Sequence, residues 1–74
     1  MSSALPIVSG HQAVSALEHI GFFQTSLHGS HVKLRHKDGS VIIPMHYELA
    51  KGTLKSILRQ VEIDTDEFLK LLFD

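Results

Sequence analysis

The 74-residue sequence contains no cysteine. A disulfide framework and thiolate chemistry are therefore both excluded, and the composition is compatible with a reducing compartment. No apolar run approaches the roughly 20 residues that a transmembrane helix needs, and no signal peptide opens the chain. We expect a soluble, cytoplasmic protein with no membrane contact.

The chain also lacks internal repeats, linkers and low-complexity segments, so we expect residues 1–74 to form a single domain. A domain of this size buries only about 60% of the surface that its unfolded chain exposes. Its core is therefore thin, and a tightly bound partner would add stability by mass action.

A strongly basic balance is missing as well, because the net charge is −1. This argues against a bulk nucleic-acid binder. The charges are nevertheless segregated: residues 28–59 carry +4 and four of the six histidines, whereas residues 60–74 carry −4. The distribution indicates a polarised surface, unless ordinary surface charges segregate here by chance.

The hydrophobic pattern predicts helices and strands in a fixed order. Ser9 and Gln12 form a predicted capping box for a helix that runs to about Ile20, with Gly21 just past its end. Strands are expected at 22–27, 30–36 and 40–43, with Pro44 ending the last one. An amphipathic helix is expected at about 51–60, and a short final helix begins near Asp64.

The pairing of the last two strands has two alternatives. A two-residue Asp38-Gly39 loop would put Leu34 opposite Ile43, and a three-residue loop would put it opposite Ile42. We favour the first, because it buries Val41 and Ile43 on the face of Leu34. The complete order predicts an α+β, two-layer domain, α-β-β-β-α with a short extra C-terminal helix and an antiparallel three-stranded sheet. This is the order and size of a double-stranded-RNA-binding domain.

The second strand carries the most informative residues. His31, Lys33 and Arg35 share one face of it, because side chains alternate along a strand, while Val32 and Leu34 point to the core. An imidazole beside two cations can shuttle a proton and neutralise a phosphodiester. On periodicity alone, these residues could equally be a solvated strand face.

Beyond this strand, a second group of cations recurs every fourth residue of the 51–60 helix. It consists of Lys51, Lys55 and Arg59, which form either a phosphate-tracking face or a solvated flank. His11 and His19 lie off the apolar stripe of the first helix, and we expect them to be exposed without a ligand role. The final helix has more apolar residues than one face can hold, so part of it is a candidate interface.

Taken together, several short motifs resemble the HicA family of toxin–antitoxin endoribonucleases over nearly the whole chain. They are, in order, Gly21-Phe22, Gly29-Ser30-His31, His36 with Asp38-Gly39, Pro44-x-His46, Gly52-Thr53-Leu54-x-x-Ile57-Leu58 and Phe68-Leu69. The chain departs from the family at Val61-Glu62, where a small residue and a glycine are usual. This departure concerns the end of a helix and not the chemistry.

The resemblance implies a fold like that of double-stranded-RNA-binding domains, cleavage of mRNA that halts translation, and neutralisation by a HicB-type antitoxin. It makes His31 the single essential histidine. Our working hypothesis is cleavage with no cofactor and no required metal. Lys33 or Arg35 would stabilise the phosphorane charge, and Ser30 would position the phosphate. His28 and His46 are candidates for the second acid or base.

Further expectations and two alternatives complete the hypothesis. Lys55 and Arg59 are candidate phosphate contacts, and His36 is expected to have a structural role at the hairpin. The same fold could instead be a non-catalytic RNA-binding module, which needs no particular histidine. A metal site is the other alternative, because histidines 28, 31, 36 and 46 are close in sequence, although zinc sites usually add a cysteine or a carboxylate.

Overall fold

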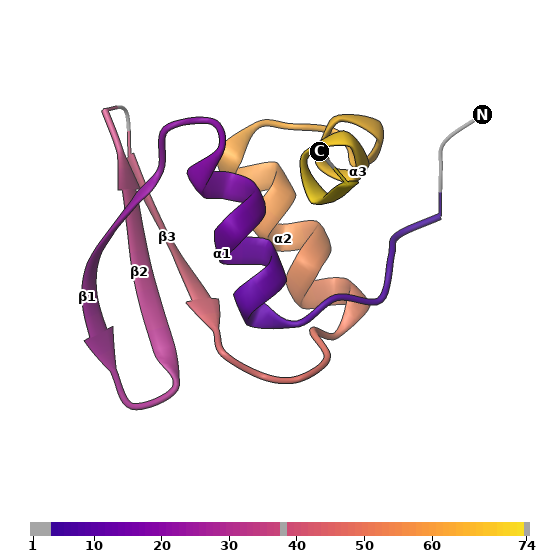
Figure 1. Ribbon diagram of the computed structural model, residues 1–74. Helices are drawn as coiled ribbons and strands as arrows, with labels where there is room; N and C mark the ends of the chain where they lie inside the picture. Colours follow the sequence, from indigo (N-terminus) through magenta and orange to yellow (C-terminus); the bar gives the residue numbers. More distant parts are fainter. Residues whose placement is uncertain (1–3, 38, 74) are drawn as a thin grey trace.

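The computed structural model describes residues 4–37 and 39–73. Within them the predicted α+β order is confirmed (Figure 1). The elements are α1 (Gly10–Glu18), β1 (Phe23–His28), β2 (His31–His36), β3 (Gly39–Pro44), α2 (Lys51–Val61) and α3 (Thr65–Phe73). No helix in these residues is long and apolar enough to cross a membrane.

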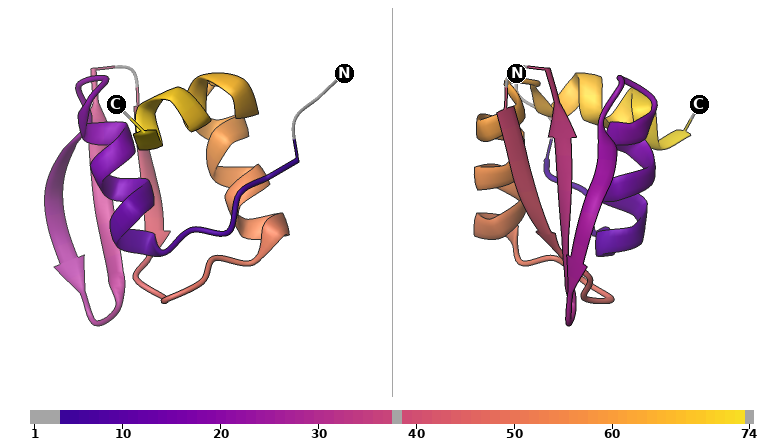
Figure 2. Two further views of the ribbon diagram at one scale, coloured as in Figure 1. Left: turned by 45° about the vertical axis from the view of Figure 1, so that its right-hand side comes forward. Right: turned by 90° about the vertical axis from the view of Figure 1, so that its left-hand side faces the viewer.

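The three strands form one antiparallel sheet in the order β1-β2-β3, and the helices all lie on one side of it (Figure 2). We call the helix-covered side the inner face and the opposite side the outer face. The four branched residues that the strand pattern assigned to the core are on the inner face, and each is at most 3% exposed: Val32, Leu34, Val41 and Ile43.

The favoured hairpin register was wrong. Leu34 pairs with Val41, and His36 pairs with Gly39, so the connection lies at residues 37–38. The three-residue alternative is not observed either. The observed register is shifted by two residues from the favoured one, and a shift of two keeps every side chain on its face. The prediction of which strand residues are buried was therefore right, although their predicted cross-strand pairing was wrong. Asp38, the first residue of the expected loop, lies outside the described residues.

The core forms where the helices meet the inner face. Leu17 of α1, Leu54 of α2 and Phe68 of α3 are almost completely buried and belong to the same core cluster as the inner-face strand residues. Burying an aliphatic or aromatic side chain of this size stabilises a fold by about 1.5–3 kcal/mol. The burial of Phe68 therefore stabilises the packing of α3 on the domain. Phe73, at the end of the same helix, is 82% exposed.

Capping interactions fix the start of each terminal helix as predicted. The Gln12 N–H donates to Ser9 Oγ at 3.1 Å, and the Ser9 N–H donates to Gln12 Oε1 at 2.9 Å. This is the predicted capping box. At α3, the Glu67 N–H donates to Asp64 Oδ1 at 2.8 Å.

The helices α1 and α2 end in the same way with different residues. After α1, the Phe22 N–H donates to the Leu17 carbonyl, and Gly21 has a positive φ of 98°. After α2, the Ile63 N–H donates to the Leu58 carbonyl, and Glu62 has a φ of 60°. Both are Schellman-type ends, which need a left-handed residue. The departure of this chain from the family pattern at Glu62 therefore places a strained residue where glycine fits without cost.

Candidate functional site

The outer face of the sheet is open to solvent. His31, Lys33 and Arg35 of β2 are all exposed on it, as predicted, while their neighbours Val32 and Leu34 are buried. In the right-hand view of Figure 2 the strands lie in front of the helices, so no described element covers this face.

The strand register adds neighbours that the sequence did not reveal. Lys33 lies between Ser26 of β1 and Ile42 of β3, and Arg35 lies between Phe23 and Ser40. Cross-strand partners share a face, so these residues belong to the outer face too. Phe23 and Ile42 are about half exposed, at 55% and 56%. The cations therefore stand among polar and apolar groups that a nucleic acid or a protein can contact.

The side chains of Phe23 and Ser26 could not be assigned to this face from the sequence. The register of β1 against β2 shifts between Gln24 and Ser26, which leaves Thr25 as an extra residue in the strand. Such a bulge breaks the alternation of side chains. It explains why the pattern of this strand is irregular in the sequence.

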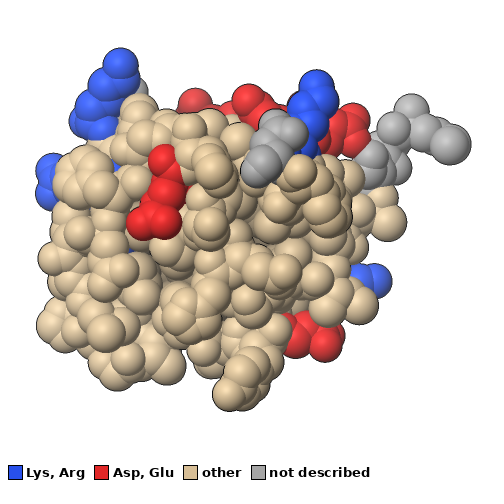
Figure 3. Space-filling view, viewed as in Figure 1, with Lys and Arg blue, Asp and Glu red and all other residues tan. Residues whose placement is uncertain are grey.

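None of the described strands carries an acidic residue. The charges of Lys33 and Arg35 therefore have no counter-charge from the sheet itself. In Figure 3, Lys and Arg atoms stand at the sheet side and along the rim, while most of the surface over α1 is uncharged. Acidic atoms gather along the upper edge, near the α2–α3 connection, where Lys or Arg atoms also stand, and further acidic groups lie elsewhere on this face.

His31 begins β2 directly after a tight turn. The turn residues are Gly29 and Ser30, and Gly29 has a positive φ of 58°. Glycine at the first central position, with positive φ there, is typical of the type II′ turn, which suits the twist of a hairpin. The turn places His28 of β1 directly opposite His31 on the outer face.

The chain after β3 passes the same end of the sheet. The Met45 N–H donates to the Ser30 carbonyl at 2.6 Å, and the His46 carbonyl accepts from the Gly10 N–H at 2.9 Å. Ser30 and His46 are both exposed. The structure thus brings His28, His31, Ser30 and His46 to one end of the sheet, with Lys33 next along the outer face.

Lys55 and Arg59 are not part of this group. They are exposed on α2, which covers the inner face, and they border a hollow lined also by Leu5 and Ile63. Their spacing along the helix was predicted correctly, but sequence spacing alone does not tell which side of the domain the helix faces.

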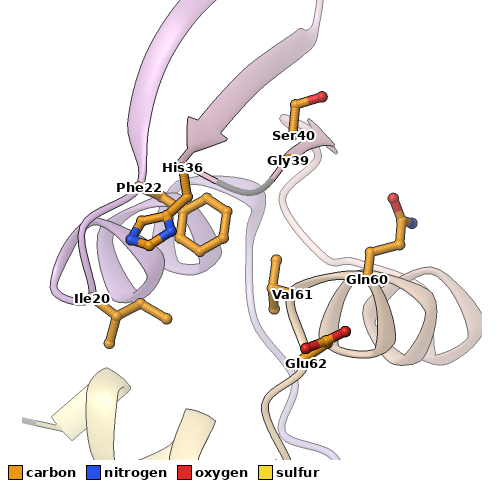
Figure 4. A pocket seen from close by; sticks show the side chains of 8 residues that line it. All are labelled: Ile20, Phe22, His36, Gly39, Ser40, Gln60, Val61 and Glu62. Carbon is orange, nitrogen blue, oxygen red and sulfur yellow. The ribbon is translucent and has the colours of Figure 1, made fainter.

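His36 is partly buried and lies against Phe22 and Gly21. Its ring centroid lies 5.0 Å from that of Phe22, and a Cβ on Gly21 would come within 2.9 Å of its Nε2. Figure 4 shows these rings on one side of a hollow, with Val61 and Glu62 across from them. These contacts agree with a structural role at this end of the hairpin.

Gly10 is a structural residue that the sequence did not reveal. A Cβ at this position would collide with the Pro44 carbonyl oxygen and lie 2.7 Å from Met45 Cα. Only glycine lets α1 approach the segment after β3 so closely. The one signal in the sequence is a glycine at the start of a helix, where many other residues are allowed.

Within residues 4–37 and 39–73, no three His, Asp or Glu side chains are grouped to hold a metal ion. His31 and His36 are on opposite faces of β2, as the alternation of the strand requires. The histidine-rich spacing of the sequence is therefore not gathered into one donor set among these residues.

Comparison with known families decides the relationship. Residues 10–63 match the family profile described as HicA toxin of bacterial toxin-antitoxin. The chain belongs to the HicA toxin family. The match runs from the first residue of α1 to just beyond α2, so it contains the whole sheet and all the outer-face residues, while α3 follows it. A search of curated proteins finds no match.

Proposed function

We propose that this HicA-family toxin is an endoribonuclease that cleaves mRNA on the outer face of its sheet. The observation that carries the proposal is the position of His31, which is exposed beside Lys33 and Arg35 on a face that no described element covers. The resemblance of Gly29-Ser30-His31 to the family motif supports His31 as the essential histidine.

The proposed chemistry uses the 2′-hydroxyl of the RNA as the nucleophile. His31 either removes the proton of this hydroxyl or protonates the leaving 5′-oxygen, since an imidazole can do both near neutral pH. Lys33 and Arg35 offer positive charge to the phosphorane, with Lys33 the nearer along the strand. Ser30, in the turn before His31, is proposed to position the phosphate. Neither step needs a metal ion.

An antitoxin of the HicB type is the proposed protein partner. The outer face has positive charge and half-exposed apolar residues, with no acidic strand residue to balance them. A partner that brings carboxylates to Lys33 and Arg35 would imitate RNA phosphates and cover His31. Its association rate is expected to fall with added salt, because exposed charges are screened.

Purified protein and a long mRNA transcript test the activity. We expect fragments with 2′,3′-cyclic phosphate ends, the same rate in excess EDTA, and a loss of about 10²–10⁴-fold in His31→Gln, which is the typical contribution of one acid or base. His19→Gln is the matched control, since His19 is an exposed histidine at the end of α1.

Three results would contradict parts of the proposal. Cleavage by His31→Gln at the wild-type rate would remove His31 from the chemistry. Loss of cleavage in EDTA would show that a metal is required. RNA binding by pure wild-type protein without any cleavage would favour the non-catalytic RNA-binding module.

A further inference from the structure

His28 and His31 form a cross-strand pair at the end of the sheet. They are the last paired residues before the Gly29-Ser30 turn, and both are exposed. Directly opposed residues of an antiparallel pair have Cβ atoms about 4.5–5.5 Å apart and point to the same side. The two imidazoles therefore leave the outer face side by side, so that one phosphate group is within reach of both.

We infer that His28 is the second proton-transfer group of the site, an inference that rests on the proposed ribonuclease activity. Cleavage by a 2′-hydroxyl needs two proton transfers, one from the nucleophile and one to the leaving group. A single imidazole cannot be the neutral base and the protonated acid at the same moment. A second group of the same kind, fixed at cross-strand distance from the first, meets this need.

The turn fixes the position of His28 relative to His31. A two-residue turn holds the residues before and after it in register, and the left-handed Gly29 permits the turn. His46 is the competing candidate, but it lies in the segment after β3, beyond the last strand pair of His31 with Pro44. Its backbone is held by Gly10, and nothing in the strand register aligns its side chain with His31.

The inferred step is balanced. The neutral imidazole of the pair takes the proton of the 2′-hydroxyl, and the 2′-oxygen forms a bond to phosphorus. The bond from phosphorus to the 5′-oxygen breaks, and the protonated imidazole gives its proton to that oxygen. The products are a 2′,3′-cyclic phosphate and a 5′-hydroxyl, and the pair ends with its protons exchanged.

The charged and titratable groups around the pair are few among the described residues. On the outer face they are Lys33 and Arg35 of β2, and the segment after β3 adds the exposed His46, Tyr47 and Glu48. Neither β1 nor β3 contributes a carboxylate. The pH dependence of cleavage should therefore report mainly the two histidines, as a bell with two limbs that belong to the pair.

The first test compares single-turnover cleavage by the wild type, His28→Gln, His46→Gln and the control His19→Gln. We expect His28→Gln to lose about 10²-fold or more and to lose one limb of the bell, while its RNA affinity stays within threefold. His46→Gln is expected to lose less than tenfold and to keep both limbs. His28 is exposed at a strand end, so circular dichroism should show an unchanged fold.

A second test uses RNA in which sulfur replaces the scissile 5′-oxygen, at a linkage first mapped with the wild type. A thiolate leaves without a proton, so a variant that lacks the general acid recovers on this substrate and one that lacks the base does not. We expect one of His28→Gln and His31→Gln to recover, and not both. This result would assign the acid and the base.

The outcomes separate this inference from the proposed function. No cleavage by the wild type would overturn both. Cleavage that needs His31 but is unchanged in His28→Gln, or a lost limb in His46→Gln instead, would overturn only the assignment of His28. Equal losses on both substrates by both variants would also overturn it, since neither would then act on the leaving group.

Discussion

The two faces of β2 are made from alternating residues of one strand, yet they are held in different ways. Val32 and Leu34 are buried between the sheet and the helices, so packing fixes their shape and position. His31, Lys33 and Arg35 are exposed on the opposite face, and the described helices lie on the other side of the sheet. The inner face thus determines the fold, and the outer face is free to carry the proposed chemistry. Substitutions should separate the two: inner changes alter stability, and outer changes alter RNA contacts.

The largest stability effect is expected at Leu34, which is 0% exposed. Leu34→Ala removes buried methyl groups and leaves a cavity, so the free energy of unfolding should fall by about 2–5 kcal/mol. Urea denaturation followed by circular dichroism measures it. The neighbouring outer-face variant Lys33→Ala should change it by less than about 0.5 kcal/mol. Similar losses in both variants would show that the faces are not independent.

A smaller loss of stability is expected at Gly10, also on the helix-covered side. Gly10→Ala puts a methyl group against the backbone of Pro44 and Met45, which cannot move aside as a flexible side chain would. We expect a loss of about 1–3 kcal/mol. Gly52→Ala in α2 is the matched control, because a Cβ there meets nothing within 4 Å. It should be neutral or stabilise by up to about 1 kcal/mol, and equal effects of the two variants would contradict the close approach at Gly10.

Glu62 offers a gain in stability instead of a loss. Glu62→Gly removes the cost of a left-handed residue that is not glycine, about 1 kcal/mol. For a domain of this size that raises Tm by about 4–8 °C. Glu62→Ala keeps the strained backbone and should give no such rise in a thermal melt. A rise in both variants would mean that the carboxylate, and not the backbone, is the source of the cost.

The smallest free-energy effect is expected from single cations, and it should appear in binding to RNA. Arg35→Ala should lower the slope of log K against log salt by about 0.7–0.9, which corresponds to one lost phosphate contact. Lys55→Ala on α2 should leave the slope unchanged if RNA lies only on the outer face. Binding to a catalytically inactive variant over a salt series measures both. A lower slope in Lys55→Ala but not in Arg35→Ala would show that the RNA binds on the helix side instead.

Much of the fold, and the division of β2 into two faces, could be predicted from the sequence, because both depend on local sequence patterns. The capping box at Ser9, the order of the elements and the face of each β2 residue follow from spacing alone. The register of the hairpin did not, since a shift of two residues leaves the pattern of buried residues unchanged. The close approach at Gly10 and the position of Lys55 depend on how distant segments meet. No local pattern encodes that.

The most direct test of the central claim is induced expression of the wild type and of His31→Ala, with growth and mRNA integrity followed over time. If the outer face of the sheet is the ribonuclease site, the wild type will arrest growth as its mRNA is degraded. His31→Ala will then express as a folded protein while growth and mRNA remain intact. Growth arrest with degraded mRNA in the His31→Ala strain would contradict the account.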